Sequence, residues 1–344
     1  MARRRRRRLK TKKLILTIFL LLLFVVMGYC AYYIFTIVKG LDDSRNASFT
    51  TDLSELGIVS GDTLTDDASD ASITNIALFG VDQREDEPCR SDVIMVATVD
   101  KRHDKIKLTS VMRDSYVPID GYGNNKINAA YFYGGPELAV KTLNQVFDLK
   151  ITDYVTVNSS EMAEIVDAVG GVQIDVSEEE RKDANHNMIE QSAQSGKPVD
   201  TIEEPGFQTL SGMQAVAYAR IRHVGNADYD RTARQREVME QIFNKGKNMN
   251  PMEYPGLIKR MLPLVETSLD LVEIMDMAGI MLRDVSFVDF RLPCNEDLIN
   301  GGSLVVDGVD YLYYDLDSSK DKLHNFIYQD ILPGQNSAGQ AQGE

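Results

Sequence analysis

The sequence predicts one N-terminal transmembrane helix followed by a single extracellular α/β domain with a mixed central sheet. Three observations predict this class. Residues 14–38 contain no charged residue, residues 1–13 before them carry nine basic residues and no acidic one, and patterns typical of strands and helices alternate from residue 73 onward. Hydrophobic residues make up 43% of the 344 positions, which suits a large folded core and excludes a disordered chain.

Residues 14–38 form the predicted transmembrane helix. At about 1.5 Å per residue, this helix covers a hydrocarbon core of roughly 30 Å with room for tilt. The basic residues 1–13 favour a cytoplasmic N-terminus, so that residues 39–344 lie outside a single-pass cell-membrane protein. A cleaved signal peptide is the alternative, but the apolar stretch is too long and no small-x-small cleavage site follows it.

Charge is divided unequally between the tail and the outer part of the chain. The whole chain has 37 Lys and Arg against 52 Asp and Glu, a net charge of −15. Without the nine basic residues of the tail, 28 basic residues stand against 52 acidic ones. An acidic outer domain argues against a nucleic-acid partner, which needs a basic face.

The folded domain is predicted at residues 74–333, between an extracellular linker at 39–73 and a flexible tail at 334–344. The linker is rich in Asp, Ser and Thr. Short apolar runs predict strands, in order, at residues 74–80, 93–99, 106–111, 154–157, 172–176 and 285–292, with a closing hairpin at 304–306 and 309–313.

Apolar residues at helical spacing predict the helices of the same domain. They fall at residues 126–133, 136–147, 159–169, 211–220, 231–247, 255–265, 271–282 and 318–328. The helix at 231–247 has the clearest buried stripe, and Asp230 is its predicted cap. Residues 177–206 are polar and are predicted to be an irregular surface excursion.

Cysteine and histidine give little evidence for a zinc site. Cys89 and Cys294 are the only extracellular cysteines, and both a disulfide bridge and two free thiols remain open. The four histidines are scattered and have no ligand spacing.

The chemical signal lies in arginines and acids at the ends of predicted elements. Phosphate-binding glycine loops, HExxH and GxSxG are missing. Each Arg–Asp pair alone is typical of a surface salt bridge worth about 0–1 kcal/mol. The set as a whole indicates a site, and it comprises Asp82, Arg90, Asp92, Arg113, Asp114, Arg220, Arg222, Arg231, Arg234 and Gln235.

Asp82 follows the first predicted strand and Asp92 opens the second. If these strands are antiparallel neighbours, the two carboxylates meet and repel each other unless a cation lies between them. Mg²⁺ is the natural candidate, because a few carboxylates hold it while phosphate and water oxygens complete its shell.

Two groups of basic residues are spaced to bind one anion. Arg220 and Arg222 are two positions apart, so they point the same way in an extended chain. Arg231, Arg234 and Gln235 share one helical face at the predicted helix N-terminus, where backbone N–H groups favour an anion. Together with the carboxylate pair, these residues outline a diphosphate receptor.

The ordered motifs of the outer domain resemble those of the LytR-CpsA-Psr family of Gram-positive bacteria. The resemblance covers about residues 74–247 and rests on GVDQR, RSD, MRDS, KINAAYFYGG, DYVTVN, DAVGGV, YARIRH and DYDRTARQR. The occurrence of so many motifs in the same order as in the family argues against a chance similarity.

The resemblance implies an α/β/α fold and an Mg²⁺-dependent phosphotransferase, with Mn²⁺ as the alternative metal. Proteins of this family move a wall glycopolymer, such as teichoic acid or capsule, from an undecaprenyl-pyrophosphate carrier to the C6 hydroxyl of peptidoglycan N-acetylmuramic acid. The expected partners are therefore the lipid-linked glycopolymer, peptidoglycan and the membrane.

Motif matching also implies residue roles. Asp82 and Asp92 would hold the metal, and the proton acceptor stays open between Asp82 and Asp114, with Arg113 as a further catalytic residue. The pyrophosphate ligands would be Arg90, Arg113, Arg220, Arg222, Arg231 and Gln235. Candidates for the lining of an apolar lipid tunnel are Leu143, Phe147, Met162, Val238, Ile242, Met261 and Leu262.

The chain departs from the family pattern at two positions. Met112 stands where the family usually has Pro, which leaves the pose of Arg113 less fixed. Cys89 beside Arg90 is outside the pattern. Two rival functions also fit: a regulatory membrane protein that affects transcription, and a polyprenyl-pyrophosphate hydrolase that uses water as acceptor.

Overall fold

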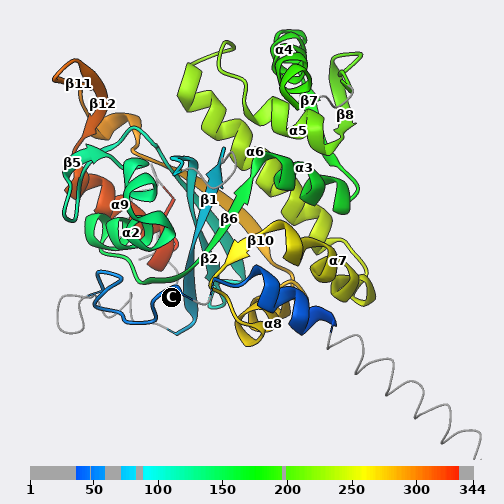
Figure 1. Ribbon diagram of the computed structural model, residues 1–344, viewed down its shortest axis with the longest axis horizontal. Helices are drawn as coiled ribbons and strands as arrows, with labels where there is room; N and C mark the ends of the chain where they lie inside the picture. Colours follow the sequence, from blue (N-terminus) through cyan, green and yellow to red (C-terminus); the bar gives the residue numbers. More distant parts are fainter. Residues whose placement is uncertain (1–35, 47, 59–70, 83–87, 196–198, 333–344) are drawn as a thin grey trace, which may run out of the picture.

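A six-stranded mixed sheet forms the centre of the molecule in the computed structural model, which describes residues 36–46, 48–58, 71–82, 88–195 and 199–332 (Figure 1). Its order is β10-β3-β2-β1-β6-β9. The β1–β2, β2–β3 and β6–β9 pairs are antiparallel, whereas β1–β6 and β3–β10 are parallel. The strands are β1 (Ile73–Val81), β2 (Ser91–Asp100), β3 (Lys105–Val111), β6 (Ile151–Asn158), β9 (Glu266–Thr267) and β10 (Ser286–Leu292). The predicted α/β domain with a mixed central sheet is confirmed.

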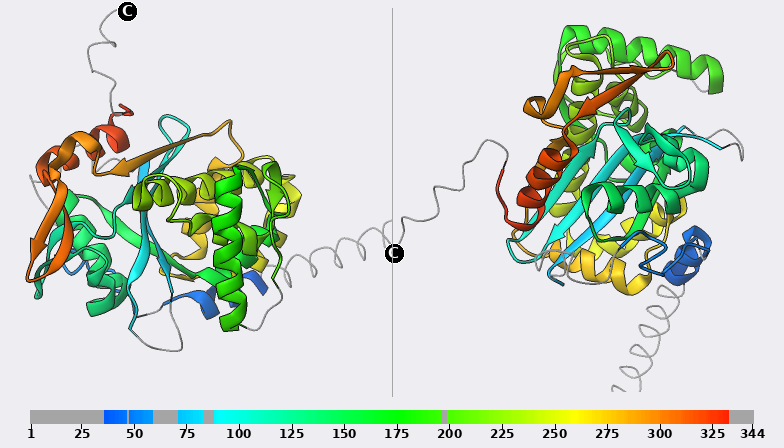
Figure 2. Two further views of the ribbon diagram at one scale, coloured as in Figure 1. Left: turned by 90° about the horizontal axis from the view of Figure 1, so that it is seen from above. Right: turned by 90° about the vertical axis from the view of Figure 1, so that its left-hand side faces the viewer.

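Helices lie on both faces of this sheet (Figures 1 and 2). One face carries α2 (Ala129–Phe147) and α9 (Leu316–Tyr328). The other carries α3 (Ser159–Ala168), α5 (Gly212–Ala219), α6 (Ala227–Lys247), α7 (Tyr254–Met261) and α8 (Leu271–Ile280). Alternation along β1 explains the two layers: Ala77, Phe79 and Val81 join the main core, whereas Leu78 and Gly80 belong to the opposite face.

Three two-stranded sheets surround this centre. They are β4 (Tyr116–Ile119) with β5 (Gly123–Lys126), β7 (Val172–Val176) with β8 (Gly206–Leu210), and β11 (Leu298–Val306) with β12 (Val309–Tyr314). Short 3-10 turns are η2 (Pro251–Glu253), η3 (Leu262–Leu264) and η4 (Asn295–Asp297). The closing hairpin predicted from the sequence is the antiparallel β11–β12 pair.

The surface excursion predicted at residues 177–206 is wrong in its first half, which forms helix α4 (Glu178–Ser195). Ser177 and Glu180 cap it reciprocally, since the Ser177 N–H donates to Glu180 Oε2 at 3.0 Å and the Glu180 N–H donates to Ser177 Oγ at 3.3 Å. Ala184 and Met188, four residues apart, are fully buried. With so few apolar residues, the helical spacing is hard to detect in the sequence.

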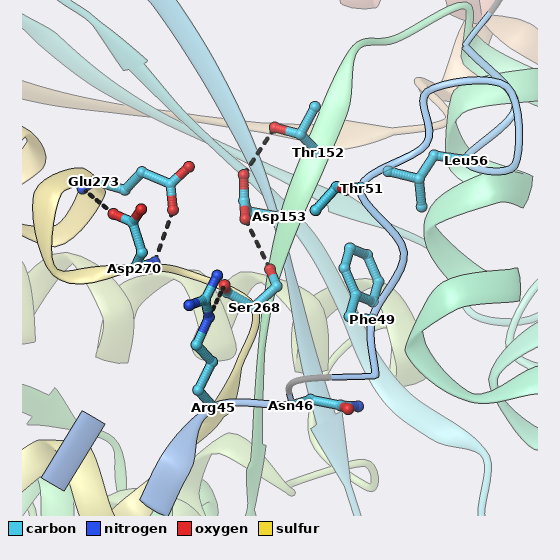
Figure 3. Close-up of a pocket in the computed structure, with 10 residues that line it drawn as sticks. All are labelled: Arg45, Asn46, Phe49, Thr51, Leu56, Thr152, Asp153, Ser268, Asp270 and Glu273. Carbon is cyan, nitrogen blue, oxygen red and sulfur yellow. Dashed lines mark hydrogen bonds between the residues drawn. The ribbon is translucent and has the colours of Figure 1, made fainter. Parts of the chain in front are cut away.

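The segment predicted as a linker, residues 39–73, packs on the domain in its described part. Residues 36–44 form a helix, and the N–H of Asn46 donates to the carbonyl of Thr267 at 2.9 Å. Leu41 and Leu56 are buried although polar residues flank them. The segment also closes a polar cavity of about 490 Å³ in which Arg45 and Phe49 face Asp153 (Figure 3).

No helix of the described ranges is long and apolar enough to cross a membrane. Most of the transmembrane helix predicted at residues 14–38 lies outside the described part of the chain, as do the tail at 1–13 and the one at 334–344.

A buried ion pair joins the sheet to the end of α9. The ammonium of Lys107 lies 2.7 Å from Asp100 Oδ2 and 3.2 Å from Asp330 Oδ1, and it donates to the Ile327 carbonyl at 2.8 Å. The side chains of Lys107 and Asp100 are fully buried. Burial alone would raise the pKa of Asp100, but hydrogen bonds from Lys107 and His103 outweigh it and lower the pKa below 3.8.

Lys107→Met should lower the free energy of unfolding by about 3–5 kcal/mol, because it leaves Asp100 buried without its counter-charge. The folded-state pKa values of Asp100 and Asp330 are both lowered. Their stabilisation is therefore present above the unfolded pKa and is lost as pH falls through the folded one, so the variant should lose part of its acid-side pH dependence. Urea unfolding between pH 3 and pH 7 measures both effects.

The matched control is Lys101→Met, which removes a partly exposed lysine that pairs with Asp276. It should change stability by no more than about 0.5 kcal/mol. Equal stability losses in the two lysine variants would contradict the importance assigned to Lys107.

Candidate functional site: an apolar cavity with a charged mouth

A cavity of about 510 Å³ lies between the second face of the sheet and helices α3, α5, α6 and α7. Close approach of α3 and α5 forms part of its wall: a Cβ atom on Gly212, the first residue of α5, would lie 1.9 Å from the carbonyl oxygen of Ala163. Most lining side chains are apolar, among them Leu78, Val93, Met95, Val155, Val157, Ile165, Val216 and Met239.

Some of the helix residues predicted to line a lipid tunnel face this cavity, and others do not. Of those predicted for a lipid tunnel, Met162, Val238, Ile242 and Met261 line it. Leu143 and Phe147 instead lie in the core beneath α2, on the other side of the sheet. Leu262 is buried beside the helix at residues 36–44 and is not among the lining residues.

Charged residues gather at one end of the cavity. The lining includes Asp82, Asp92, Arg220, Arg222, Arg231 and Gln235. Asp82 and Asp92 both line this end of the cavity, because β1 and β2 are antiparallel and Val81 at the end of β1 pairs with Ser91 at the start of β2. Both side chains are about half exposed.

Arg231 is the most unusual of these residues. It is only 3% exposed, and its pKa is lowered to about 10, chiefly by burial and next by the nearby guanidinium of Arg113, with a smaller contribution from Arg222. One carboxylate, Asp228, pairs with it at 2.9 Å. Among the described residues, its buried Nε has no hydrogen-bond partner. A buried cation with an unused donor beside two like charges favours an anionic ligand.

Arg113 is held against the same mouth. Its guanidinium pairs with Asp92, and its Nε lies 3.7 Å from Asp114 Oδ2. That Nε is also buried without a hydrogen-bond partner in the described ranges. Asp92 therefore connects Arg113 to the cavity lining, to which Asp82 and Asp92 both belong. The Met112-Arg113 peptide is fixed without a proline, since the Met112 carbonyl accepts hydrogen bonds from the Ser115 N–H at 3.1 Å and from Ser115 Oγ at 2.6 Å.

Arg220 and Arg222 reach the cavity by a turn, not by the extended chain that was predicted. Arg220 ends α5 with φ −97° and ψ −5°, and it lies 3.6 Å from Asp82 Oδ2. Asp183 of α4 accepts hydrogen bonds from the N–H groups of Arg222 at 3.3 Å and of His223 at 3.5 Å. Helix α4, which the sequence did not predict, therefore positions the loop that bears Arg222 and His223.

Arg234 corrects another expectation. It does not share the ligand-facing side of α6 with Arg231 and Gln235; it pairs with Glu180 at 2.8 Å and donates to the Ile221 and Val224 carbonyls. Helix α6 starts at Ala227 with Asn226 in the cap position, so Asp230 is not its cap and Arg231 lies inside the helix. Guanidinium groups, and not free N–H groups of a helix end, therefore supply the positive charge at this end of the cavity.

Three predicted site residues lie outside the lining: Arg113, which reaches the mouth only through Asp92, and Arg90 and Asp114. Arg90 is exposed on the segment that leads into β2. Asp114 pairs with Lys126 at 2.8 Å and with Arg113. Conversely, the cavity is lined by polar residues that the sequence reading missed: Asn158, Ser159, Asn187 and His223. Asn158 carried a usable signal, because it caps α3 directly after β6.

Cys89 and Cys294 are free thiols in the structure, which decides between the alternatives left open by the sequence. The pKa of Cys89 is raised by burial and by the charges of Asp82 and Asp92. The pKa of Cys294 is raised to about 11 by burial and by Glu296. Burial and the neighbouring carboxylates therefore favour the protonated form of both thiols.

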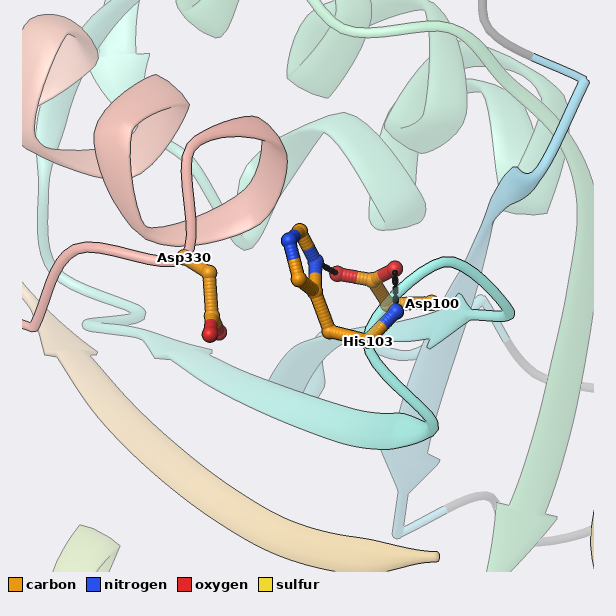
Figure 4. Close-up of side chains that lie close together, drawn as sticks. All are labelled: Asp100, His103 and Asp330. Atoms are coloured by element: carbon orange, nitrogen blue, oxygen red, sulfur yellow. Dashed lines mark hydrogen bonds and ion pairs between the residues drawn. The ribbon is translucent and has the colours of Figure 1, made fainter. Parts of the chain in front are cut away.

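Two groups of residues could hold a metal. Asp100, His103 and Asp330 bring their ligand atoms within 4.8 Å of one another (Figure 4), the one such group of three among the described residues. The Lys107 ammonium already supplies positive charge there. The Asp82–Asp92 pair fits Mg²⁺ better by chemistry, because Mg²⁺ takes one or two carboxylates and completes its shell with phosphate and water.

An apolar cavity that ends in neighbouring guanidinium groups and two carboxylates defines a protein that binds an amphiphilic anion. Within that class, the chain belongs to the LytR_cpsA_psr family, whose sequence model matches residues 39–325. The match includes the N-terminal segment that packs on the domain.

Its relatives include named enzymes. The chain is 32% identical over 255 residues to a polyisoprenyl-teichoic acid–peptidoglycan teichoic acid transferase TagU of Bacillus cereus strain AH820, covering 73% of this chain and 77% of the relative. It is 30% identical over 252 residues to TagU of Enterococcus faecalis, covering 69% and 73%. A structure of TagT bound to LI-WTA matches with a TM-score of 0.62 and 25% identity, over 82% of this chain and 99% of that chain.

Proposed function

We propose that this chain is a membrane-anchored phosphotransferase that joins a polyisoprenyl-linked teichoic acid, or a related glycopolymer, to the C6 hydroxyl of peptidoglycan N-acetylmuramic acid. The observation that carries the proposal is the pairing of an apolar cavity with the buried, incompletely bonded Arg231 at its charged end. A polyprenyl pyrophosphate has the matching form, an apolar chain that ends in a diphosphate. The transferase names of the relatives give the same reaction class.

The arginines carry the electrostatic part of the reaction. Arg113 and Arg222 are both close enough to Arg231 to lower its pKa, so the three guanidinium groups can share the oxygens of one diphosphate. Charge that builds up on the transferred phosphoryl group is stabilised by guanidiniums that the fold already holds in place. Glu180 and Asp183 contribute indirectly, since they fix Arg234 and the loop that bears Arg222.

Asp82 and Asp92 would hold Mg²⁺, or Mn²⁺ as the alternative. When bound, the metal would neutralise phosphate charge and orient the diphosphate for in-line attack. Asp82 is also the better proton acceptor for the sugar hydroxyl, because it lines the cavity whereas Asp114 is engaged by Lys126. Arg90 remains a candidate ligand at the outer rim.

The anchor completes the proposed assembly. Residues 14–38 would cross the membrane with residues 1–13 in the cytoplasm, which keeps the cavity near a substrate dissolved in the bilayer. A transcription regulator is not favoured, because no described feature offers a nucleic-acid surface and the charged site lies on the outer domain.

A reconstituted transfer reaction tests the function. Full-length chain in lipid nanodiscs is incubated with a lipid-pyrophosphate-linked saccharide, peptidoglycan fragments and Mg²⁺. The expected result is a saccharide joined to the fragments through a phosphodiester. Release of the saccharide phosphate without a joined product would contradict the ligase and favour the hydrolase.

Filling the cavity should separate lipid recognition from chemistry. Ile242→Trp, on the cavity side of α6, should raise the KM for a long polyprenyl donor at least about tenfold, because overpacking excludes the chain. A donor with one or two isoprene units should be affected much less. Steady-state kinetics with both donors measures the difference, and Val305→Trp on β11 is an exposed control. Equal effects on both donors would contradict lipid binding in this cavity.

A further inference from the structure

Helix α8 carries an exposed apolar stripe. Val272, Met275 and Leu282 are 75%, 59% and 63% exposed, and Gly279 lies between the last two. Positions 272, 275, 279 and 282 follow helical spacing and so lie along one side of α8 and the turn that ends it. Large apolar residues aligned in this way indicate a contact surface, since exposed apolar residues usually occur singly.

Three pairs of opposite charges lie beside the stripe. Lys101 pairs with Asp276, Lys247 lies 2.9 Å from Asp284, and Arg283 lies 3.0 Å from Asp104. Each of these pairs is neutral as a whole, whereas Asp270 and Glu273 at the start of α8 accept hydrogen bonds from each other's backbone N–H groups. A surface of this kind favours insertion of apolar side chains over attraction of a charged partner.

The path of the chain shows which partner is nearest. Figure 1 and the right-hand view of Figure 2 place α8 and the helix at residues 36–44 at the same end of the molecule. That helix is fixed to the domain, because Ser44 Oγ donates to the Leu262 carbonyl and Leu41 is buried. The apolar stretch ends at residue 38, so only about 9 Å of helix separates its last residue from Ser44.

We propose that the α8 stripe inserts into the outer surface of the lipid bilayer and holds the domain in one orientation on the membrane. The proposal rests on the membrane anchor of the proposed function. A rigid connection shorter than two helical turns leaves the domain no freedom to turn this end away from the lipid. Met261 and Val265 line the cavity and flank Leu262, which contacts the helix at residues 36–44, so part of the apolar wall of the cavity lies beside the segment that follows the anchor.

Tryptophan fluorescence tests the proposal directly, because the chain contains no tryptophan. Single Met275→Trp and Phe207→Trp variants of the full-length chain are placed in nanodiscs whose phospholipids carry bromine near the headgroup end of the acyl chains. Phe207 is 70% exposed on β8, at the end opposite to α8 in Figure 1. Bromine should quench the Met275→Trp emission strongly and leave the Phe207→Trp emission unchanged.

The outcomes separate the surface from the anchor. A chain that enters nanodiscs but shows no quenching in Met275→Trp, or equal quenching in both variants, would overturn the docking surface and leave the anchor intact. A chain that does not enter nanodiscs would overturn both. As a second readout, Val272→Asp with Met275→Asp should slow transfer from a bilayer-borne donor severalfold while leaving turnover of a short, water-soluble donor unchanged. Equal slowing with both donors would contradict a role at the membrane.

Discussion

Arg231→Met should reduce glycopolymer transfer about 100- to 1,000-fold while the protein stays at least as stable as the wild type. The activity loss follows from removing the buried guanidinium that ends the cavity. The stability follows from the lowered pKa of Arg231, about 10: charging this group costs free energy in the unliganded fold at every pH below that value. Transfer rates and thermal unfolding, measured on the same preparation, check both parts.

Inorganic pyrophosphate gives an independent readout for Arg231. It should raise the melting temperature of the wild-type protein and have little effect on Arg231→Met, since a ligand stabilises only the fold that binds it. Arg260→Met, which changes an exposed arginine on α7, is the matched control and should behave as the wild type does. A large stability loss in Arg231→Met would mean that this arginine is structural, and the assignment would then be wrong.

Asp92→Asn should cause a loss of similar size, about 100-fold or more, because it removes both a proposed metal ligand and the partner of Arg113. Asparagine keeps the shape of the side chain, so folding should be unaffected. The specific sign of a metal role is a shift of the Mg²⁺ titration of activity to higher concentrations, with a parallel shift for Mn²⁺.

The control for this charge change is Asp284→Asn, an exposed carboxylate that pairs with Lys247. It should leave both activity and the Mg²⁺ titration unchanged. If Asp92→Asn lowered the rate with an unchanged titration midpoint, Asp92 would act by orienting Arg113 alone, and metal binding would have to be assigned elsewhere.

The sequence was most informative where neighbouring elements are also neighbours in space. Asp82 and Asp92 could be brought together in advance, because consecutive strands joined by a short segment tend to pair. The strands of the central sheet other than the two-residue β9, and the helix that carries Arg231, were also predicted. In these cases the pattern of apolar residues is dense enough to reveal the period.

Prediction failed where a contact depends on distant partners. The spacing of Arg231 and Arg234 predicts that both lie on one side of α6. In the structure, Arg234 instead pairs with Glu180 of α4, beside the loop that bears Arg222. Helix α4 was not predicted from the sequence, so this partner could not be foreseen. Likewise, the linker composition of residues 39–58 hid single buried residues such as Leu56. The spacing of residues along a helix determines the side of the helix from which a side chain leaves the backbone. Contacts with charged and packed groups far away in the sequence determine where the end of a long side chain lies.

The most direct test of the central claim is a crystal structure of the protein with a polyprenyl pyrophosphate and Mg²⁺. The diphosphate should lie within hydrogen-bond distance of Arg113, Arg222 and Arg231, with the isoprene chain in the cavity between the sheet and α6. A lipid whose phosphates bind away from these arginines, with the cavity left without the chain, would contradict the proposed site.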